Sequence, residues 1–333
     1  MARIAINGFG RIGRQVFKAL VEFFPNSEIV AINDIASPET LAHLLRFDSN
    51  YGRYNKSVSV SDKALIVDGR KITCLQERDI NSLPWTKYEI DIVIEASGIF
   101  KDRDKAGLHL KNGAKKVLIT APSKDPDLMI VRGVNDSMYD PSKHHIISNA
   151  SCTTNSLAPV VKVLNDKFKV EYGFMTTIHS YTGDQRLLDA PHGDMRRARN
   201  AATNIVPTST GAAGAVAKVI PELAGKLTGI SVRVPTQVVS LTDFVCQVQG
   251  DISEDRVNIE LERACREEMK GILSYSEEPL VSSDYIGSPY SGVVDALSTM
   301  VLGTHLVKLC IWYDNEWAYS IRIAEVANML LGE

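Results

Sequence analysis

Short apolar runs alternate with amphipathic stretches through the first half of the chain. The runs have the length of strands and the stretches between them have helical spacing, which is typical of a doubly wound, mostly parallel sheet. Residues 57–75 instead alternate around a turn, which predicts a hairpin that leaves the parallel pattern. The apolar runs cover residues 2–7, 28–33, 90–94 and 117–120.

Longer runs of β-forming residues follow in the second half. Together with two helical patterns they predict an α+β domain in which helices pack on an antiparallel sheet. The β-type runs cover 173–180, 230–234, 238–248 and 305–313, and the helical patterns cover 211–223 and 254–270.

The chain of 333 residues is longer than one domain usually is, so two domains are expected. A last helical pattern at 317–331 could pack back on the first half. The predicted domains are therefore 1–151 plus 316–333, and 152–315. The fold class is α/β in the first domain and α+β in the second.

Composition narrows the class of protein. With 44% hydrophobic and 23% charged residues the chain is ordinary for a globular protein, and its net charge of −3 speaks against nucleic-acid binding. No apolar run reaches the roughly eighteen residues of a membrane span, and no signal peptide is recognised. The five scattered cysteines indicate reduced thiols, so a cytoplasmic enzyme is expected. No His/Cys spacing indicates a metal site.

A glycine-rich turn connects the first strand to the first helix. Gly8, Gly10 and Gly13 have the spacing that lets a backbone turn tightly beneath a pyrophosphate, and the helix N-terminus favours its negative charge. Asp34 ends the next strand, where a carboxylate can accept hydrogen bonds from ribose hydroxyls. Ser97 and Gly98 follow a later strand, at the edge where such sheets bind ligands, although these residues could equally form a plain turn. The sequence therefore predicts a Rossmann domain that binds a dinucleotide.

Cys152 stands at the predicted start of a helix. The unpaired N–H groups there favour an anion and are expected to lower the pKa of a thiol. A lone cysteine is often just a small buried hydrophobe, but the polar neighbours Ser151 and Thr153 favour a nucleophile. His179 ends the next predicted strand, so a helix and a returning strand could bring the two side chains together. A histidine at a strand end is otherwise most often a surface residue or a satisfied core residue. An imidazole beside the thiol would act as its base.

A nicotinamide site and a cysteine nucleophile together predict oxidation of an aldehyde through a thioester. Anion-binding groups would identify the substrate and the acceptor. Each candidate alone could be a helix cap or a surface residue, and together they only suggest phosphate. The candidates are Ser151, Thr153, Thr182, Arg197, Thr210, Gly211 and Arg233.

Five motifs then resemble the glyceraldehyde-3-phosphate dehydrogenase family along the whole chain. They are Asn7-Gly-Phe-Gly-Arg-Ile-Gly-Arg14, Ser148-Asn-Ala-Ser-Cys-Thr-Thr-Asn155, Pro207-Thr-Ser-Thr-Gly-Ala-Ala213, Arg233-Val-Pro-Thr236 and Trp312-Tyr-Asp-Asn-Glu-Trp317. The resemblance implies an NAD-dependent, phosphorylating enzyme of glycolysis and gluconeogenesis. Inorganic phosphate would attack the thioester to give 1,3-bisphosphoglycerate, and the protein would be a homotetramer in which the 181–206 loop approaches a neighbour's cofactor.

The resemblance also implies roles for individual residues. Cys152 would be the nucleophile and His179 the base. Thr182, Asp184 and Arg233 would hold the substrate phosphate. Inorganic phosphate would be held by Ser151, Thr153, Thr210 and Gly211, with Arg197 nearby. The cofactor would be contacted by Arg11, Ile12, Asp34, Arg78, Ser97 and Thr120, and its nicotinamide amide by Asn315.

Some positions depart from the family pattern. Ser156 replaces a common second cysteine, Gly214 a common lysine, and Gln237-Val238 the usual Pro-Asn, which leaves local packing near the last two open. Ala190-Pro191 lies between the Leu-Pro of NAD-specific relatives and the Ala-Ser of NADP-using ones. Since Asp34 would repel a 2′-phosphate, NAD is the expected cofactor, with NADP left open as a second one.

The sequence is compatible with alternative functions. An erythrose-4-phosphate dehydrogenase would share the cysteine motif and the glycine turn, but it resembles the chain less at 181–184 and 208–211. An aspartate-semialdehyde dehydrogenase would have a different cysteine context. A cofactor-binding regulator or RNA-associated protein is a further alternative, against which the net charge and the paired Cys152 and His179 both count.

Overall fold

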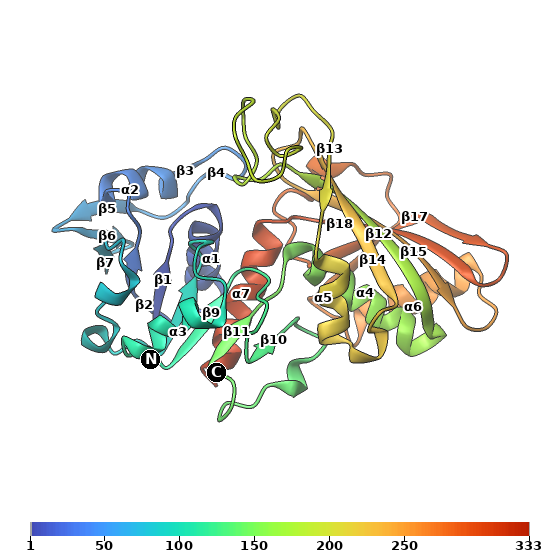
Figure 1. Cartoon of the computed structure of the whole chain (residues 1–333), viewed down its shortest axis with the longest axis horizontal. Coiled ribbons are helices and arrows are strands. Elements are labelled where there is room, and N and C mark those ends of the chain that lie inside the picture. The colour runs from blue at the N-terminus through green and yellow to red at the C-terminus, as the bar shows by residue number, and fades with distance from the viewer. Residues whose placement is uncertain (1, 333) are drawn as a thin grey trace. The chain divides into compact units, whose positions relative to one another are not determined.

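The computed structural model describes residues 2–332, which fall into two compact units (Figure 1). Unit 1 comprises residues 2–130, 137–150 and 320–332. Unit 2 comprises residues 131–136 and 151–319. Each unit has its own sheet.

Unit 1 is built on a sheet of nine strands among the described residues, in the order β10-β11-β9-β8-β1-β2-β7-β6-β5. The strands from β10 to β7 are parallel, whereas β5 and β6 pair antiparallel. The strands are β1 (Arg3–Asn7), β2 (Glu28–Asn33), β5 (Val58–Ser61), β6 (Ala64–Val67), β7 (Arg70–Leu75), β8 (Ile92–Glu95), β9 (Lys116–Ile119), β10 (Leu128–Met129) and β11 (Ile146–Ser148); β3 (Phe47–Asp48) and β4 (Gly52–Arg53) form a separate small ladder. The helices are α1 (Arg11–Phe23), α2 (Pro38–Arg46), α3 (Arg103–Lys111) and α7 (Trp317–Leu330), which enters this unit at residue 320.

The order of strands in unit 1 reverses between β1 and β8. From β1 the chain proceeds to β2 on one side, and it returns to β8 on the other. In open α/β sheets such a reversal opens a crevice at the carboxyl ends of the two strands, where ligands bind. Asn7 and Glu95 are the last residues of these strands.

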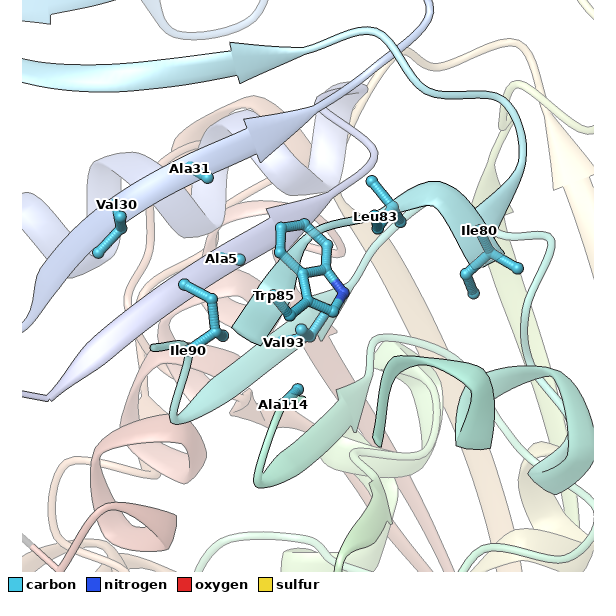
Figure 2. Close-up of a cluster of buried hydrophobic side chains, with 9 residues drawn as sticks. All are labelled: Ala5, Val30, Ala31, Ile80, Leu83, Trp85, Ile90, Val93 and Ala114. Atoms are coloured by element: carbon cyan, nitrogen blue, oxygen red, sulfur yellow. The ribbon is translucent and has the colours of Figure 1, made fainter. Parts of the chain in front are cut away.

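The core of unit 1 includes a cluster around the fully buried Trp85 (Figure 2). Figure 2 shows the Trp85 indole close to Leu83 and Val93, in a cluster that reaches Ala5 on β1. The buried faces of β1 and β8 therefore share one apolar core.

Unit 2 is built on a mixed sheet of seven strands in the described part of the chain, in the order β13-β14-β12-β15-β18-β17-β16. Helices α4, α5 and α6 pack on one face of this sheet. The strands are β12 (Val170–Ser180), β13 (Val206–Ser209), β14 (Leu227–Val234), β15 (Ser240–Val248), β16 (Leu273–Ser276), β17 (Gly292–Leu302) and β18 (Leu306–Tyr313). The helices are α4 (Cys152–Phe168), α5 (Ala212–Val219) and α6 (Glu254–Arg266).

The predicted α/β fold class is confirmed, as is the hairpin at 57–75. Asp68 and Gly69 both have positive φ at its turn between β6 and β7, as the tightest hairpins require. The second sheet differs in part, because β12–β14 and β16–β17 are parallel pairs within the predicted antiparallel sheet. Strands β13, β16 and β17 were not predicted.

No helix within residues 2–332 combines the length and apolar character that crossing a lipid bilayer requires.

Candidate active site

Cys152 is the first residue of α4. Ser151 caps this helix, because its hydroxyl accepts the N–H of Thr154 at 3.0 Å. The first turn of the helix therefore directs N–H groups at the position of the thiol. Pro159 lies inside α4.

The Cys152 sulfur lies 3.5 Å from Nε2 of His179. His179 is the next-to-last residue of β12 and is 4% exposed. Its Nδ1 lies 2.7 Å from the carbonyl oxygen of Ser180, which can only accept a hydrogen bond. In the tautomer that donates this bond, Nδ1 carries the proton and Nε2 faces the thiol as an acceptor.

Burial controls the charge of both groups. It lowers the pKa of His179 to about 3, with the nearby Arg233 cation acting in the same direction. Burial also raises the pKa of the Cys152 thiol, although Arg233 and the Thr153 hydroxyl and N–H oppose it. The expectation of a lowered thiol pKa is therefore wrong for the protein without ligands, because desolvation outweighs the helix terminus. The resting pair is a neutral thiol and a neutral imidazole.

Arg233 lies on β14 beside His179. Its Nη1 is 3.0 Å from His179 Nδ1, 3.2 Å from the Ser180 carbonyl and 3.4 Å from the Thr182 hydroxyl. Its buried Nε has no hydrogen-bond partner among the described residues. A partly buried guanidinium with an unused donor suits a ligand anion such as phosphate.

The loop before β13 is held together by Arg197. This guanidinium donates to Asp184 at 2.6 Å, to the Thr208 hydroxyl at 2.9 Å and to the Ser209 carbonyl at 3.3 Å. Asp194 accepts from the same Thr208 hydroxyl at 2.7 Å. The carboxylate of Asp184 is thus occupied by a cation of its own loop.

A second helix begins close to the first. Gly211 is the N-cap of α5, and the Thr210 hydroxyl accepts the N–H of Ala212 at 3.2 Å. The Thr154 hydroxyl donates to the Ala212 carbonyl at 3.5 Å, which ties the first turns of α4 and α5 together. The four residues predicted to hold inorganic phosphate therefore lie at two adjoining helix starts.

One of these four turns its side chain into the core. The Thr153 hydroxyl lies 2.8 Å from the hydroxyl of Tyr313, which lies at the same distance from that of Thr177. The Tyr313 ring also stands edge-on to His179 at 6.0 Å between centroids. Tyr313 was missed as a site residue, although it belongs to the Trp312–Trp317 motif.

Asn315 follows β18 and is 6% exposed. Its Oδ1 accepts the hydroxyls of Ser180 at 2.9 Å and Ser240 at 3.1 Å. These two bonds fix the orientation of the carboxamide and leave its amino group as the donor.

Of the two departures near α5 and β15, Gly214 is accommodated simply. A Cβ there would meet open space, so packing does not require glycine. Gln237 is exposed, while Val238 is buried and is followed by Val239 at a φ of 72°.

In unit 1, the glycine turn and Asp34 meet at the carboxyl ends of β1 and β2. The Asp34 carboxylate accepts the N–H of Phe9 at 2.8 Å and that of Ala36 at 3.0 Å. A Cβ on Gly13 would collide with the carbonyl of Gly8, so α1 can begin this close to the turn only with glycine. Both features fit a bound dinucleotide, which needs close approach of the backbone and an acceptor for ribose hydroxyls.

The other predicted cofactor residues lie at the same edge of this sheet. Arg11 and Ile12 begin α1, and the Arg11 guanidinium pairs with Asp48 at 3.1 Å. Arg78 follows β7, Ser97 and Gly98 follow β8, and Thr120 follows β9. Because parallel strands end at one edge, residues far apart in the sequence converge there. Unit 1 has a sheet edge that fits a dinucleotide, and unit 2 has a thiol beside an imidazole. These two features define the class of nicotinamide-dependent dehydrogenases that use a cysteine.

Comparison with known proteins identifies the family. The glyceraldehyde 3-phosphate dehydrogenase NAD binding domain matches residues 2–103, and the C-terminal domain of the same family matches residues 151–315. The chain therefore belongs to the glyceraldehyde-3-phosphate dehydrogenase family, and its cofactor is NAD.

Three relatives illustrate the similarity. Glyceraldehyde-3-phosphate dehydrogenase of Geobacillus stearothermophilus is 54% identical over 325 residues, 98% of this chain and 97% of the relative. Glyceraldehyde-3-phosphate dehydrogenase 2 of Trichormus variabilis is 55% identical over 332 residues, 99% and 98% of the two chains. Glyceraldehyde-3-phosphate dehydrogenase 2 of Bacillus subtilis is 52% identical over 325 residues, which are 97% of this chain and 95% of the relative.

All five cysteines are free thiols. Within residues 2–332, no group of three or more His, Cys, Asp and Glu side chains is arranged to hold a metal ion.

Proposed function

We propose that this protein oxidises glyceraldehyde 3-phosphate with NAD and inorganic phosphate, giving 1,3-bisphosphoglycerate. The observation that carries the proposal is the 3.5 Å approach of the Cys152 sulfur to His179 Nε2 at the start of α4. The name shared by relatives more than 50% identical along nearly the whole chain supports the same substrate.

The chain's own groups supply the proton transfers. His179 Nε2 takes the thiol proton, the Cys152 thiolate adds to the aldehyde carbon, and the proton passes from His179 to the former carbonyl oxygen to give a hemithioacetal. NAD, when bound, supplies the hydride acceptor for the oxidation. His179 Nε2 then takes the proton of the hemithioacetal hydroxyl as the carbon loses its hydride and becomes a thioester. Phosphate then attacks the thioester carbon, and the sulfur leaves as the thiolate.

The positions of the polar groups support two proposed phosphate sites. For the substrate phosphate we assign Thr182, Asp184 and Arg233, with Asp184 acting through the Arg197 guanidinium that it binds. For inorganic phosphate we assign the helix starts at Ser151, Thr153, Thr210 and Gly211, with Arg197 nearby. Thr153 would serve through its N–H, since its hydroxyl is bonded to Tyr313.

We assign NAD binding to a domain of residues 1–151 plus 316–333, and catalysis to residues 152–315. Asp34 supports NAD as the preferred cofactor, because its carboxylate would repel the 2′-phosphate of NADP. Ala190 leaves room for some use of NADP. The proposed cofactor contacts are Gly8, Gly10, Arg11, Ile12, Gly13, Asp34, Arg78, Ser97, Gly98, Thr120 and Asn315.

We further propose a cytoplasmic homotetramer. The face of the unit 2 sheet opposite α4 and α6 exposes large apolar side chains on several strands, and a second copy of the chain would cover them. The 181–206 loop also exposes apolar side chains suited to contact with another subunit. The exposed residues are Tyr172, Phe174, Ile230, Leu297, Met300 and Leu302 on the sheet, and Leu187, Leu188, Met195 and Ile205 on the loop. Five free thiols are consistent with a reducing compartment.

The test is a spectrophotometric assay of NAD and NADP reduction with glyceraldehyde 3-phosphate, with and without phosphate or arsenate. Sustained turnover that requires the anion is expected, with NAD as the faster cofactor. A single burst without turnover under every condition would contradict the assigned acceptor site. Reduction with erythrose 4-phosphate alone would contradict the proposed substrate.

A further inference from the structure

A buried carboxylate lies where the strand order of unit 1 reverses. Glu95 is the last residue of β8 and is 2% exposed. Its Oε2 accepts Asn7 Nδ2 at 2.5 Å and lies 2.9 Å from His109 Nε2. Its Oε1 accepts the Ser97 N–H at 2.8 Å and the Ser97 hydroxyl at 2.5 Å. Four donors thus converge on one side chain, and only an ionised carboxylate accepts from all four.

The direction of the bond from His109 is fixed from its far side. The Trp85 indole N–H, which can only donate, lies 2.9 Å from His109 Nδ1. Nδ1 is therefore the acceptor, and His109 Nε2 carries the proton that points at Glu95. Trp85 is itself held in the apolar cluster of Figure 2, so the core fixes this end of the network.

The opposite end of the network reaches β2 and the loop after β7. Asn7 Oδ1 accepts from Asn33 Nδ2 at 2.8 Å. Asn33 Oδ1 in turn accepts the N–H of Glu77 at 2.9 Å, next to Arg78. The carboxyl ends of β8, β1 and β2 and the loop after β7 are therefore linked by side chains whose donors and acceptors all match.

Ser97 is the member of this network that faces the ligand edge. It is half-buried, its hydroxyl proton points to Glu95, and its Oγ accepts the N–H of Ile99 at 3.2 Å. A hydroxyl oxygen has two lone pairs, so one remains for a donor from outside. With its proton committed to Glu95, the Ser97 hydroxyl can only accept from a ligand, and a ribose hydroxyl is able to donate to it.

The glycine turn packs directly on the same segment. A Cβ on Gly8 would collide with the backbone nitrogen and Cα of Ser97. Glu95 binds Asn7, which precedes Gly8, with one oxygen and binds Ser97 with the other. The Glu95 carboxylate therefore holds both of the segments that approach each other here, the turn at Gly8 and the backbone at Ser97.

We propose that Glu95 is a positioning residue for NAD, which clamps the Asn7–Gly8 turn to Ser97 and makes the Ser97 hydroxyl an acceptor for a hydroxyl of the bound dinucleotide. The proposal rests on the NAD site described under Proposed function. Glutamine at position 95 would carry an NH₂ group in place of one oxygen. In either orientation of that amide, its NH₂ group would face two groups that also donate: Asn7 and His109 on one side, or the N–H and hydroxyl of Ser97 on the other.

The experiment is a titration of NAD into the full-length protein, without aldehyde, for Glu95→Gln and for a matched control. Glu22→Gln makes the same chemical change on the exposed side of α1 in the same unit. We expect Glu95→Gln to raise the Kd for NAD about tenfold, and the control to stay within about twofold of the parent. The KM for glyceraldehyde 3-phosphate and the alkylation of Cys152 without NAD should not change.

Variants of Ser97 test the route by which Glu95 acts, even if Glu95→Gln does not fold. Ser97→Ala should raise the Kd for NAD about fivefold, while Ser97→Thr, which keeps the hydroxyl, should restore it to within about twofold. In the double variant, Ser97→Ala should add little to Glu95→Gln, since both remove the same oriented hydroxyl.

Three outcomes would overturn the proposal: parental NAD affinity in folded Glu95→Gln, parental affinity in Ser97→Ala, or fully additive effects in the double variant. Each is distinct from failure of the proposed function. That failure would appear as the absence of NAD reduction by the parent protein with glyceraldehyde 3-phosphate.

Discussion

Nε2 of His179 lies 3.5 Å from the Cys152 sulfur, and it can accept the thiol proton in the tautomer whose Nδ1 donates to the Ser180 carbonyl. The pKa of His179 is lowered to about 3, so this nitrogen stays an acceptor throughout the neutral range. The thiol has a raised pKa and needs such an acceptor to become a nucleophile. Cys152 and His179 are therefore arranged to transfer the thiol proton when the reaction begins, and they do not form an ion pair of thiolate and imidazolium beforehand.

Cys152→Ser should lower kcat by more than about a thousandfold, because a hydroxyl beside this imidazole is a far weaker nucleophile than a thiol. NAD binding should persist, since the predicted cofactor contacts on unit 1 are intact. Initial rates and an NAD titration on the same preparation measure the two effects. Loss of NAD binding would mean that Cys152 is a structural residue.

His179→Asn should lower kcat by about a hundredfold or more, through loss of the base. The substitution should also make the free energy of unfolding less sensitive to low pH. His179 is neutral in the folded protein down to about pH 3, whereas an unfolded histidine binds a proton below about pH 6.5. The unfolded state therefore binds more protons between these values, and the parent loses stability as the pH falls through this window.

Urea unfolding at pH 7 and pH 4.5 measures this linkage. The parent should lose about 2 to 3 kcal/mol more than His179→Asn between the two conditions. An equal loss in both proteins would show that His179 is not buried in its neutral form. His305→Asn, which changes an exposed histidine, is the matched control.

The rate of Cys152 alkylation by iodoacetamide in the ligand-free protein should keep rising with pH to above pH 9, because burial raises the thiol pKa. Arg233→Gln should make alkylation at pH 8 slower than in the parent, since the Arg233 cation opposes the rise in the thiol pKa. Mass spectrometry of the Cys152 peptide separates this thiol from the other four. A plateau below pH 8 would instead indicate a preformed thiolate–imidazolium pair.

Asp34→Gly combined with Pro191→Ser should raise the ratio of kcat/KM for NADP to that for NAD by at least about tenfold. The carboxylate that would repel a 2′-phosphate is removed, and a hydroxyl is added at position 191. Parallel assays with the two cofactors give the ratio. If it stays at the parental value, cofactor choice depends on other residues.

Tyr313→Phe should lower the free energy of unfolding by about 1 to 3 kcal/mol, because the buried hydroxyls of Thr153 and Thr177 would each lose a partner. Tyr172→Phe changes an exposed tyrosine and should have little effect. Denaturant unfolding of both variants makes the comparison. Equal stabilities would mean that the two threonines find other partners.

The sequence by itself was sufficient for the elements with strong local signals. The alternation around Asp68-Gly69 specified a hairpin, and the glycine turn before α1 specified a dinucleotide fold, because both depend on φ values and spacings that a few residues determine. Strand β17 was missed, since its sequence Gly-Val-Val-Asp-Ala-Leu-Ser-Thr-Met-Val-Leu mixes apolar and polar residues without a clear period.

Tertiary structure decided the chemistry of the site. The thiol pKa is an example: the start of a helix can be recognised in the sequence, but desolvation depends on what the whole fold packs around Cys152. Tyr313, Ser180 and Ser240 likewise gain their contacts only when β12, β15 and β18 pair side by side.

Glu95 makes the same contrast in unit 1. In the sequence it is a charged residue at the end of an apolar run, with nothing to mark it as buried. Its four donors come from Asn7, Ser97 and His109, which are brought together by the pairing of β1 with β8 and by the packing of α3. Local sequence determines which segments form strands, helices and turns, because those depend on neighbouring residues; the protonation and hydrogen bonding of buried groups depend on contacts between segments far apart in the chain.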